Sequence, residues 1–183
     1  MARNTARRPR PPLDRERLND LALRYVGKYA TTRAKLASYL KRKLRERGWN
    51  DAGEPPVERI VERFAETGLV DDAAFASSKA RSLSERGYGA GRVSMALRAA
   101  GIDDEDGAAA RELAAGQAVE AALKFARRRR IGPFADTRPD RHSREKALAA
   151  MIRAGHGFDL ARTIVDCEPG AEPELDSWHG KAR

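Results

Sequence analysis

The residue types that usually carry enzyme chemistry are few in this 183-residue chain and lie at unsuitable spacings. The histidines, His142, His156 and His179, have no cysteine or acidic residue around them at metal-ligand spacing. The single cysteine, Cys167, lies between two acidic residues, whose charges raise a thiol pKa and weaken the nucleophile. We therefore expect a non-enzymatic protein with no catalytic residue, metal or cofactor. For His156 we expect a partly buried packing role.

The glycines Gly87, Gly89 and Gly91 alternate in a way that invites comparison with phosphate-binding loops. Such a loop follows a β-strand and is followed by Lys-Ser or Lys-Thr. This sequence has neither feature, so a nucleotide site of that kind is not expected.

Positive charge is the stronger chemical signal, because 36 Lys and Arg stand against 27 Asp and Glu, for a net charge of +9. Residues 33–47 hold seven basic residues and one acid, Glu46. Self-repulsion costs such a helix stability unless an anion relieves it. We predict contacts with the DNA phosphate backbone or an acidic protein surface, whereas sparse aromatic residues disfavour a base-stacking platform. The candidate binding residues are Arg33, Lys35, Lys41, Arg42, Lys43, Arg45, Arg47, Arg81, Arg86, Arg92, Arg98, Arg127, Arg128, Arg129 and Arg130.

The elements that position these residues are predicted to be helices throughout. The chain has 33 Ala and 15 Leu but only 12 Val and Ile together, and Ala and Leu favour helix. Asp14 and either Thr31 or Thr32 are suited to begin helices, and Gly48 and Gly68 to end them. No segment alternates with a period of two, so the predicted class is all-α.

Three similar segments indicate an internal repeat. Each ends in a glycine (Gly48, Gly101 and Gly155), and these glycines are 53 and 54 residues apart. Units of about 50 residues bury little surface alone, so we expect three tandem three-helix repeats stacked into an elongated, curved body. The alternative is coincidental similarity among Leu- and Ala-rich helices. The predicted repeats are residues 13–70, 71–115 and 116–166.

The two ends differ in charge from the middle. Residues 1–12 contain four arginines and three prolines, which predicts a disordered basic arm. Residues 166–183 carry five acidic against two basic groups, a net charge of −3, which leaves +12 on residues 1–165. Residues 167–183 are therefore predicted to be an acidic flexible tail. No apolar run approaches the roughly 20 residues of a membrane span, and no secretory signal is recognisable. We expect a cytoplasmic protein that is monomeric when free.

Several motifs occur in a characteristic order. The central ones are Gly68–Ala76 and Arg86–Ile102, and the pattern continues through Leu36–Trp49, Arg127–Phe134 and Gly155–Val165. In order and spacing this pattern resembles the RecX family, bacterial regulators of the RecA recombinase, over about residues 15–166. Two departures from the family pattern weaken any charge contact assigned to those positions. Ala99 and Ala100 stand where a basic pair is common, and His156 replaces the usual aromatic residue.

The resemblance implies three tandem three-helix repeats, in agreement with the repeat count. It also implies binding in the groove of the RecA filament on single-stranded DNA. Such binding restrains ATP hydrolysis, strand exchange and co-protease activity in DNA repair and the SOS response. The alternative is a basic helical protein that binds DNA or RNA directly. The excess of positive charge is consistent with both functions and does not separate them.

Overall fold

The structure, a computed structural model, describes residues 11–173 and Leu175. Most of the predicted basic arm and the end of the predicted acidic tail lie outside the described residues. Within them the regular structure is helical, apart from one isolated parallel β-bridge between Leu13 and Trp49. The predicted all-α class is confirmed.

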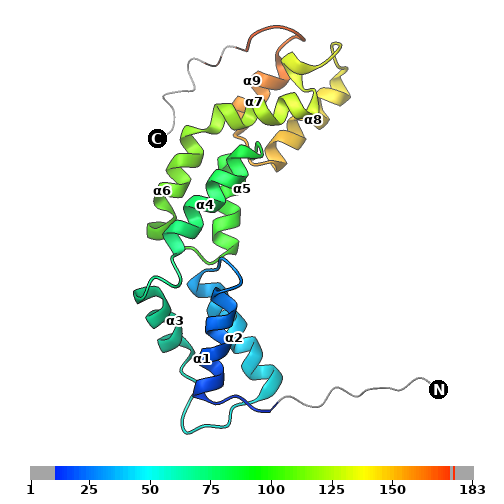
Figure 1. Ribbon diagram of the computed structural model, residues 1–183. Coiled ribbons are helices and arrows are strands. Elements are labelled where there is room, and N and C mark those ends of the chain that lie inside the picture. Colours follow the sequence, from blue (N-terminus) through cyan, green and yellow to red (C-terminus); the bar gives the residue numbers. More distant parts are fainter. Residues whose placement is uncertain (1–10, 174, 176–183) are drawn as a thin grey trace, which may run out of the picture. The chain divides into compact units, whose positions relative to one another are not determined.

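Nine α-helices follow one another along the described residues (Figure 1). A short 3₁₀ turn, Gly132–Phe134, connects the seventh to the eighth. None of these helices combines the length and apolar character needed to cross a membrane. The helices are α1 (Arg15–Val26), α2 (Arg33–Arg47), α3 (Val57–Glu66), α4 (Asp72–Glu85), α5 (Ala90–Ala99), α6 (Asp104–Gly116), α7 (Ala118–Arg129), α8 (Arg141–Arg153) and α9 (Phe158–Asp166).

The predicted helix boundaries have a clear local origin. The Asp14 carboxylate accepts a hydrogen bond from the Arg17 N–H at 2.9 Å and begins α1. Thr32, rather than Thr31, caps α2 by accepting from the Lys35 N–H at 3.2 Å. These side chains satisfy amide groups that the first turn of a helix leaves unpaired.

The repeat glycines behave as the sequence predicts. Gly48, Gly101 and Gly155 follow α2, α5 and α8 with φ values of +78°, +73° and +91°. Residues with a Cβ atom are strained at such positive φ values. Glycine has none, so it can end each helix without that strain.

Three separate hydrophobic cores match three consecutive helix triplets, α1–α3, α4–α6 and α7–α9. Leu40, Leu97 and Met151, one from each core, are completely buried. In the second core Ala80 of α4 and Ala114 of α6 are buried, and such small side chains let the two helices pack closely. Each repeat therefore has its own apolar interior.

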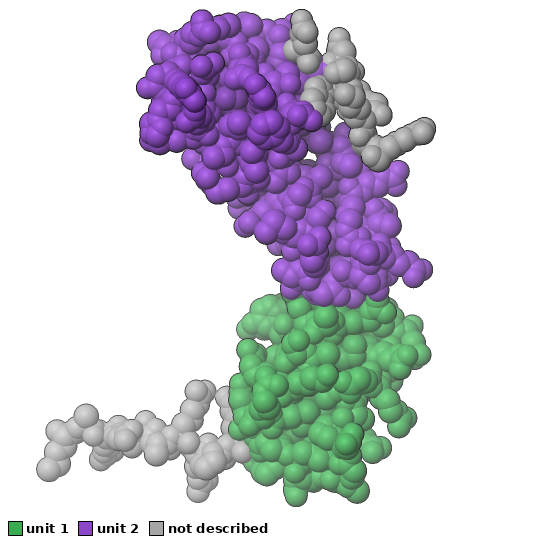
Figure 2. All heavy atoms as spheres, turned by 180° about the vertical axis from the view of Figure 1, so that it is seen from behind, with its two compact units in different colours: residues 1–71 green, residues 72–183 purple. Residues whose placement is uncertain are grey.

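The chain divides into two compact units, residues 1–71 and 72–183, coloured separately in Figure 2. The first holds α1–α3 and the second holds α4–α9. Within the second unit two repeats meet through backbone groups: the Gly89 N–H donates to the Ala154 carbonyl and the Gly91 N–H to the Gly155 carbonyl, both at 3.0 Å. A Cβ atom on Gly89 would lie 2.3 Å from the Gly155 oxygen. Close backbone approach thus accounts for glycine at position 89.

The segment after α9 contacts the third repeat. The Gly170 N–H donates to the Pro133 carbonyl at 2.9 Å, and Leu175 is buried in the third core. Glu168 pairs with Arg138 at 3.1 Å. The body of the third repeat therefore continues past residue 166, the boundary predicted from the sequence, because one apolar side chain finds a core there.

Candidate anion-binding interface

Helix α2 presents a band of basic side chains to solvent. Its opposite face buries Leu36 and Leu40 completely, and helical periodicity turns the intervening residues outward. We call these outward residues the α2 basic band. They are the exposed Arg33, Lys35, Lys41, Arg42 and Arg45 and the half-buried Lys43.

Two carboxylates balance part of the α2 basic band. Glu58 of α3 accepts a hydrogen bond from Lys41 Nζ at 2.8 Å, and this bond lowers the pKa of the Glu58 carboxyl group. Glu46 pairs with both Arg42 and Lys43. The band therefore repels itself less than the sequence suggests, because Glu58 approaches from a different helix.

Arg47, at the end of α2, contacts the segment before α1. Its guanidinium group donates to the Pro11 carbonyl at 2.9 and 2.7 Å. Nearby, the Leu13 N–H donates to the Gly48 carbonyl and the Asn50 N–H to the Leu13 carbonyl, at 3.0 and 2.8 Å. Arg47 therefore helps to hold the chain before α1 against the end of α2.

Three tyrosines meet between α1 and α2, and we call them the tyrosine cluster: Tyr25, Tyr29 and Tyr39. The rings of Tyr25 and Tyr39 stack with centroids 4.2 Å apart and planes within 13°. The Tyr29 ring is tilted against Tyr25 at 5.4 Å, and Tyr29 is 50% exposed. Tyr39 lies 14 residues after Tyr25 and on the next helix, so the packing of α1 against α2 creates an aromatic group that the low aromatic content did not predict.

Cations lie against these rings. Lys28 Nζ is 5.4 Å from the Tyr29 centroid, and Arg42 and Lys43 are 5.6 and 5.8 Å from that of Tyr39. A ring face attracts a cation through its quadrupole. Two side chains of the α2 basic band, Arg42 and Lys43, thus lie against the tyrosine cluster.

A second basic group lies where the second and third repeats meet, and we call it the junction cluster: Arg86, Arg92 and Arg128. Arg86 and Arg92 lie over Tyr88, with guanidinium carbons 5.4 and 5.9 Å from its centroid. Arg128 of α7 donates to the Arg86 carbonyl at 2.7 Å. The structure therefore brings together three residues that the sequence separates by up to 42 positions.

The remaining candidates of the second unit are more dispersed. Arg127 lies 4.9 Å from the Phe134 centroid, on the 3₁₀ turn. Arg130 pairs with Asp136 at 2.8 Å and has a left-handed φ of +52°. Arg81, Arg98 and Arg129 are exposed on α4, α5 and α7.

His156 is buried beside the junction cluster, as its predicted packing role requires. Its ring meets Phe125 edge-on at 5.4 Å. Neither ring nitrogen makes a hydrogen bond of standard geometry to the described residues. Burial lowers the pKa of His156 to about 4, and the nearby Gly87 backbone offsets part of this shift. The imidazole is therefore neutral at pH 7 and serves packing.

An apolar groove of about 700 Å³ opens at the same junction. Met95 of α5 and Ile152 of α8 line it and are 60% and 42% exposed. Arg92 and Arg153 also line it. This combination fits an apolar side chain that has acidic neighbours.

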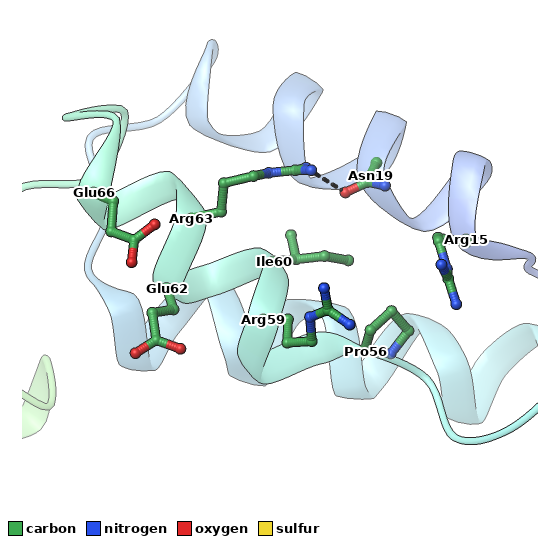
Figure 3. A pocket seen from close by; sticks show the side chains of 8 residues that line it. All are labelled: Arg15, Asn19, Pro56, Arg59, Ile60, Glu62, Arg63 and Glu66. Carbon is green, nitrogen blue, oxygen red and sulfur yellow. Dashed lines mark hydrogen bonds between the residues drawn. The ribbon is translucent and has the colours of Figure 1, made fainter.

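A further pocket, of about 400 Å³, lies between α1 and α3 (Figure 3). Arg15, Arg59 and Arg63 line it, and the Arg63 guanidinium donates to Asn19 Oδ1 at 2.7 Å. None of these three arginines was among the binding residues predicted from the sequence, where acidic residues lie close to each of them. Glu62 and Glu66, which line the same pocket, reduce its attraction for an anion.

Cys167 is a poor nucleophile, as the sequence predicts. Partial burial raises the pKa of its thiol, and the neighbouring Glu168 carboxylate raises it further. Among the described residues, no group of three His, Cys, Asp or Glu side chains is placed to hold a metal ion.

Comparisons with known proteins give a consistent result. Residues 71–110 match the family model described as RecX, second three-helix domain. The chain is 33% identical over 161 residues to the regulatory protein RecX of Myxococcus xanthus, covering 83% of this chain and 86% of that protein. It is 30% identical over 154 residues to RecX of Mycobacterium sp. strain JLS, covering 82% of each. The crystal structure of RecX from Lactobacillus salivarius has the same fold, with a TM-score of 0.58 at 22% identity over 82% of this chain and 93% of that one.

Proposed function

The chain belongs to the RecX family of regulatory proteins, and from this premise we propose that it regulates the RecA recombinase by binding the RecA filament on single-stranded DNA. In this proposal it is a non-enzymatic cytoplasmic protein. Bound to the filament, it inhibits DNA-dependent ATP hydrolysis, strand exchange and co-protease activity.

Inhibition of this kind needs binding rather than covalent chemistry. A protein that occupies the filament groove excludes duplex DNA and repressor from it. Preferential binding to one state of the filament shifts the equilibrium toward that state, by as much as the difference in binding free energy.

The observation that carries the proposal is the α2 basic band. Most of its cations are exposed on a helix whose apolar face is anchored in a core, so a phosphate backbone can reach them without a change of fold. The apolar groove between Arg92 and Arg153 supports the protein side of the contact, because it suits an apolar side chain with acidic neighbours on a recombinase protomer.

The test is RecA-catalysed, DNA-dependent ATP hydrolysis with and without the purified protein. The wild-type protein should inhibit it. Replacing Arg42 and Arg45 by Glu should abolish inhibition with helicity unchanged, because both side chains are exposed. The matched control replaces Arg15 and Arg59, which line the pocket of Figure 3, and makes the same change in net charge. Full inhibition by the Arg42/Arg45 variant at moderate salt would contradict a role for α2.

The second candidate is a protein that binds DNA or RNA directly, which the same basic band favours. A filament regulator should bind recombinase-coated DNA much more tightly than naked DNA. A direct binder should prefer the naked strand, and log–log plots of its affinity against salt should lose about 1 in slope for each phosphate contact removed.

A further inference from the structure

We propose that the tyrosine cluster, with Lys28, Arg42 and Lys43, forms a base-stacking subsite for single-stranded DNA. An unpaired base stacks on the exposed ring of Tyr29, and the three cations lie beside the flanking phosphates. The inference deepens the proposed function, on which it rests for its biological ligand, by assigning a DNA contact to residues 1–71.

The rings are already ordered without a ligand. Tyr25 and Tyr39 stack on each other and pack against the core of the first repeat. Tyr29 leans on Tyr25 yet stays half exposed. A ring held in this way keeps part of its apolar surface open to solvent, beside Lys28, and loses little conformational entropy when a base covers it.

The charges around the rings select the ligand. Lys28 Nζ lies 5.4 Å from the Tyr29 centroid, so a base on Tyr29 brings its phosphates near this cation. Arg42 and Lys43 lie within 6 Å of the Tyr39 centroid, at the other end of the stacked rings, where the continuing strand meets further positive charge. Aromatic rings next to cations are the common means of holding a single strand. Bases in a duplex are stacked on one another, so the exposed ring favours the unpaired strand.

Packing alone is the competing explanation for the tyrosines. It predicts that loss of the Tyr29 ring changes stability, and it predicts no dependence of binding on the presence of bases. A base-dependent measurement therefore separates the two explanations.

The test compares binding of the full chain to fluorescently labelled oligo(dT) and to an abasic oligonucleotide of the same length, by fluorescence anisotropy. The wild-type protein should prefer oligo(dT). Tyr29→Ala should weaken oligo(dT) binding roughly 5- to 100-fold and should leave abasic binding nearly unchanged. Tyr29→Phe should retain the preference, and so should the control Arg59→Ala. Equal wild-type affinity for the two oligonucleotides, or an undiminished preference in Tyr29→Ala, would overturn the proposal.

Photocrosslinking identifies the part of the chain that contacts the base. Trypsin separates the tyrosines into the peptides 25–28, 29–33 and 36–41. Oligonucleotides containing 5-iododeoxyuridine should crosslink mainly to peptide 29–33, and crosslinks confined to other peptides would contradict the subsite. A matching RNA that binds and crosslinks better than the DNA would overturn the choice of ligand. No recombinase is present in these assays, so failure of the protein to inhibit RecA would refute the proposed function and leave this test intact.

Discussion

The α2 basic band and the junction cluster contain the same kinds of side chain but are attached to the fold differently. On α2 the cations contact other side chains, such as Glu58 and Tyr39. In the junction cluster Arg128 holds a backbone carbonyl, next to glycines through which two repeats touch. A substitution at an exposed cation of α2 such as Arg42 therefore changes mainly surface charge, whereas substitution of Arg128 also removes a hydrogen bond to the backbone. Loss of binding without loss of fold is therefore easier to interpret at Arg42.

The largest effects on stability are expected from substitutions in the cores of the first and second repeats. Leu40→Ala and Leu97→Ala each remove a completely buried side chain. Each should lower the free energy of unfolding by about 2–5 kcal/mol, measured by urea denaturation. Hydrogen exchange should rise in the first unit for Leu40→Ala and in the second for Leu97→Ala. The control Leu23→Ala, at a side chain 55% exposed, should change stability by about 0.5 kcal/mol or less. A loss below about 1 kcal/mol in Leu97→Ala would contradict its burial.

A pH effect should distinguish the second unit from the first. The pKa of His156 in the folded protein is about 4, against an ordinary value of 6.5. Between these values the unfolded chain binds a proton that the folded chain does not. This contribution to stability is therefore complete above pH 6.5 and is lost as the pH falls toward 4. The loss amounts to about 3 kcal/mol.

The His156→Phe variant provides the measurement for that prediction. Urea midpoints at pH 7 and pH 4.5 should differ less in the variant than in the wild-type protein, because no imidazole remains to be protonated. An unchanged pH dependence in His156→Phe would show that other groups are responsible.

The backbone contact at the junction should be sensitive to one methyl group. Gly89→Ala places a Cβ atom 2.3 Å from the Gly155 oxygen, and relief of that overlap should cost about 1–3 kcal/mol, measured by thermal denaturation. Gly116→Ala is the matched control, because nothing lies within 4 Å of its Cβ position in α6. It should be neutral or stabilise by about 0.5–1 kcal/mol. Equal melting temperatures for the two variants would show that the close backbone contact at Gly89 does not contribute to stability.

The smallest expected effects come from single cations. Arg128→Gln should cost about 1 kcal/mol, because the Arg86 carbonyl loses a charged donor. Arg42→Gln should cost about 0.5 kcal/mol or less, because its ion pair with Glu46 is exposed. Urea denaturation measures both changes. A larger loss of stability in Arg42→Gln than in Arg128→Gln would contradict the view that Arg128 supports the fold more than Arg42 does.

Much of the fold could be predicted because its signals are local. Caps such as Asp14 and Thr32 act on amides three residues away. The glycines at 48, 101 and 155 end helices through their own backbone conformation. Such features leave a pattern within one turn of helix, and their recurrence about every 53 residues predicted the repeats.

The candidate site was less predictable because its geometry depends on contacts between distant segments. The composition of residues 33–47 predicted the basic character of α2, but nothing local indicated that Glu58 would pair with Lys41. Tyr25 and Tyr39 stack across two helices. Leu175 lies in a polar segment without periodicity, so a single apolar residue was too weak a signal for its burial.

The ion pairs of the α2 basic band also set a threshold for any anion that approaches it. Glu46 and Glu58 already pair with three of its cations, Lys41, Arg42 and Lys43, so a phosphate that binds at these positions must displace a carboxylate. For an isolated anion this exchange is nearly balanced, since one charged contact replaces another. A dense, regular array of phosphates can displace both carboxylates together and releases its own counterions in doing so. We therefore expect the α2 basic band to discriminate against small anions in favour of a polyanion.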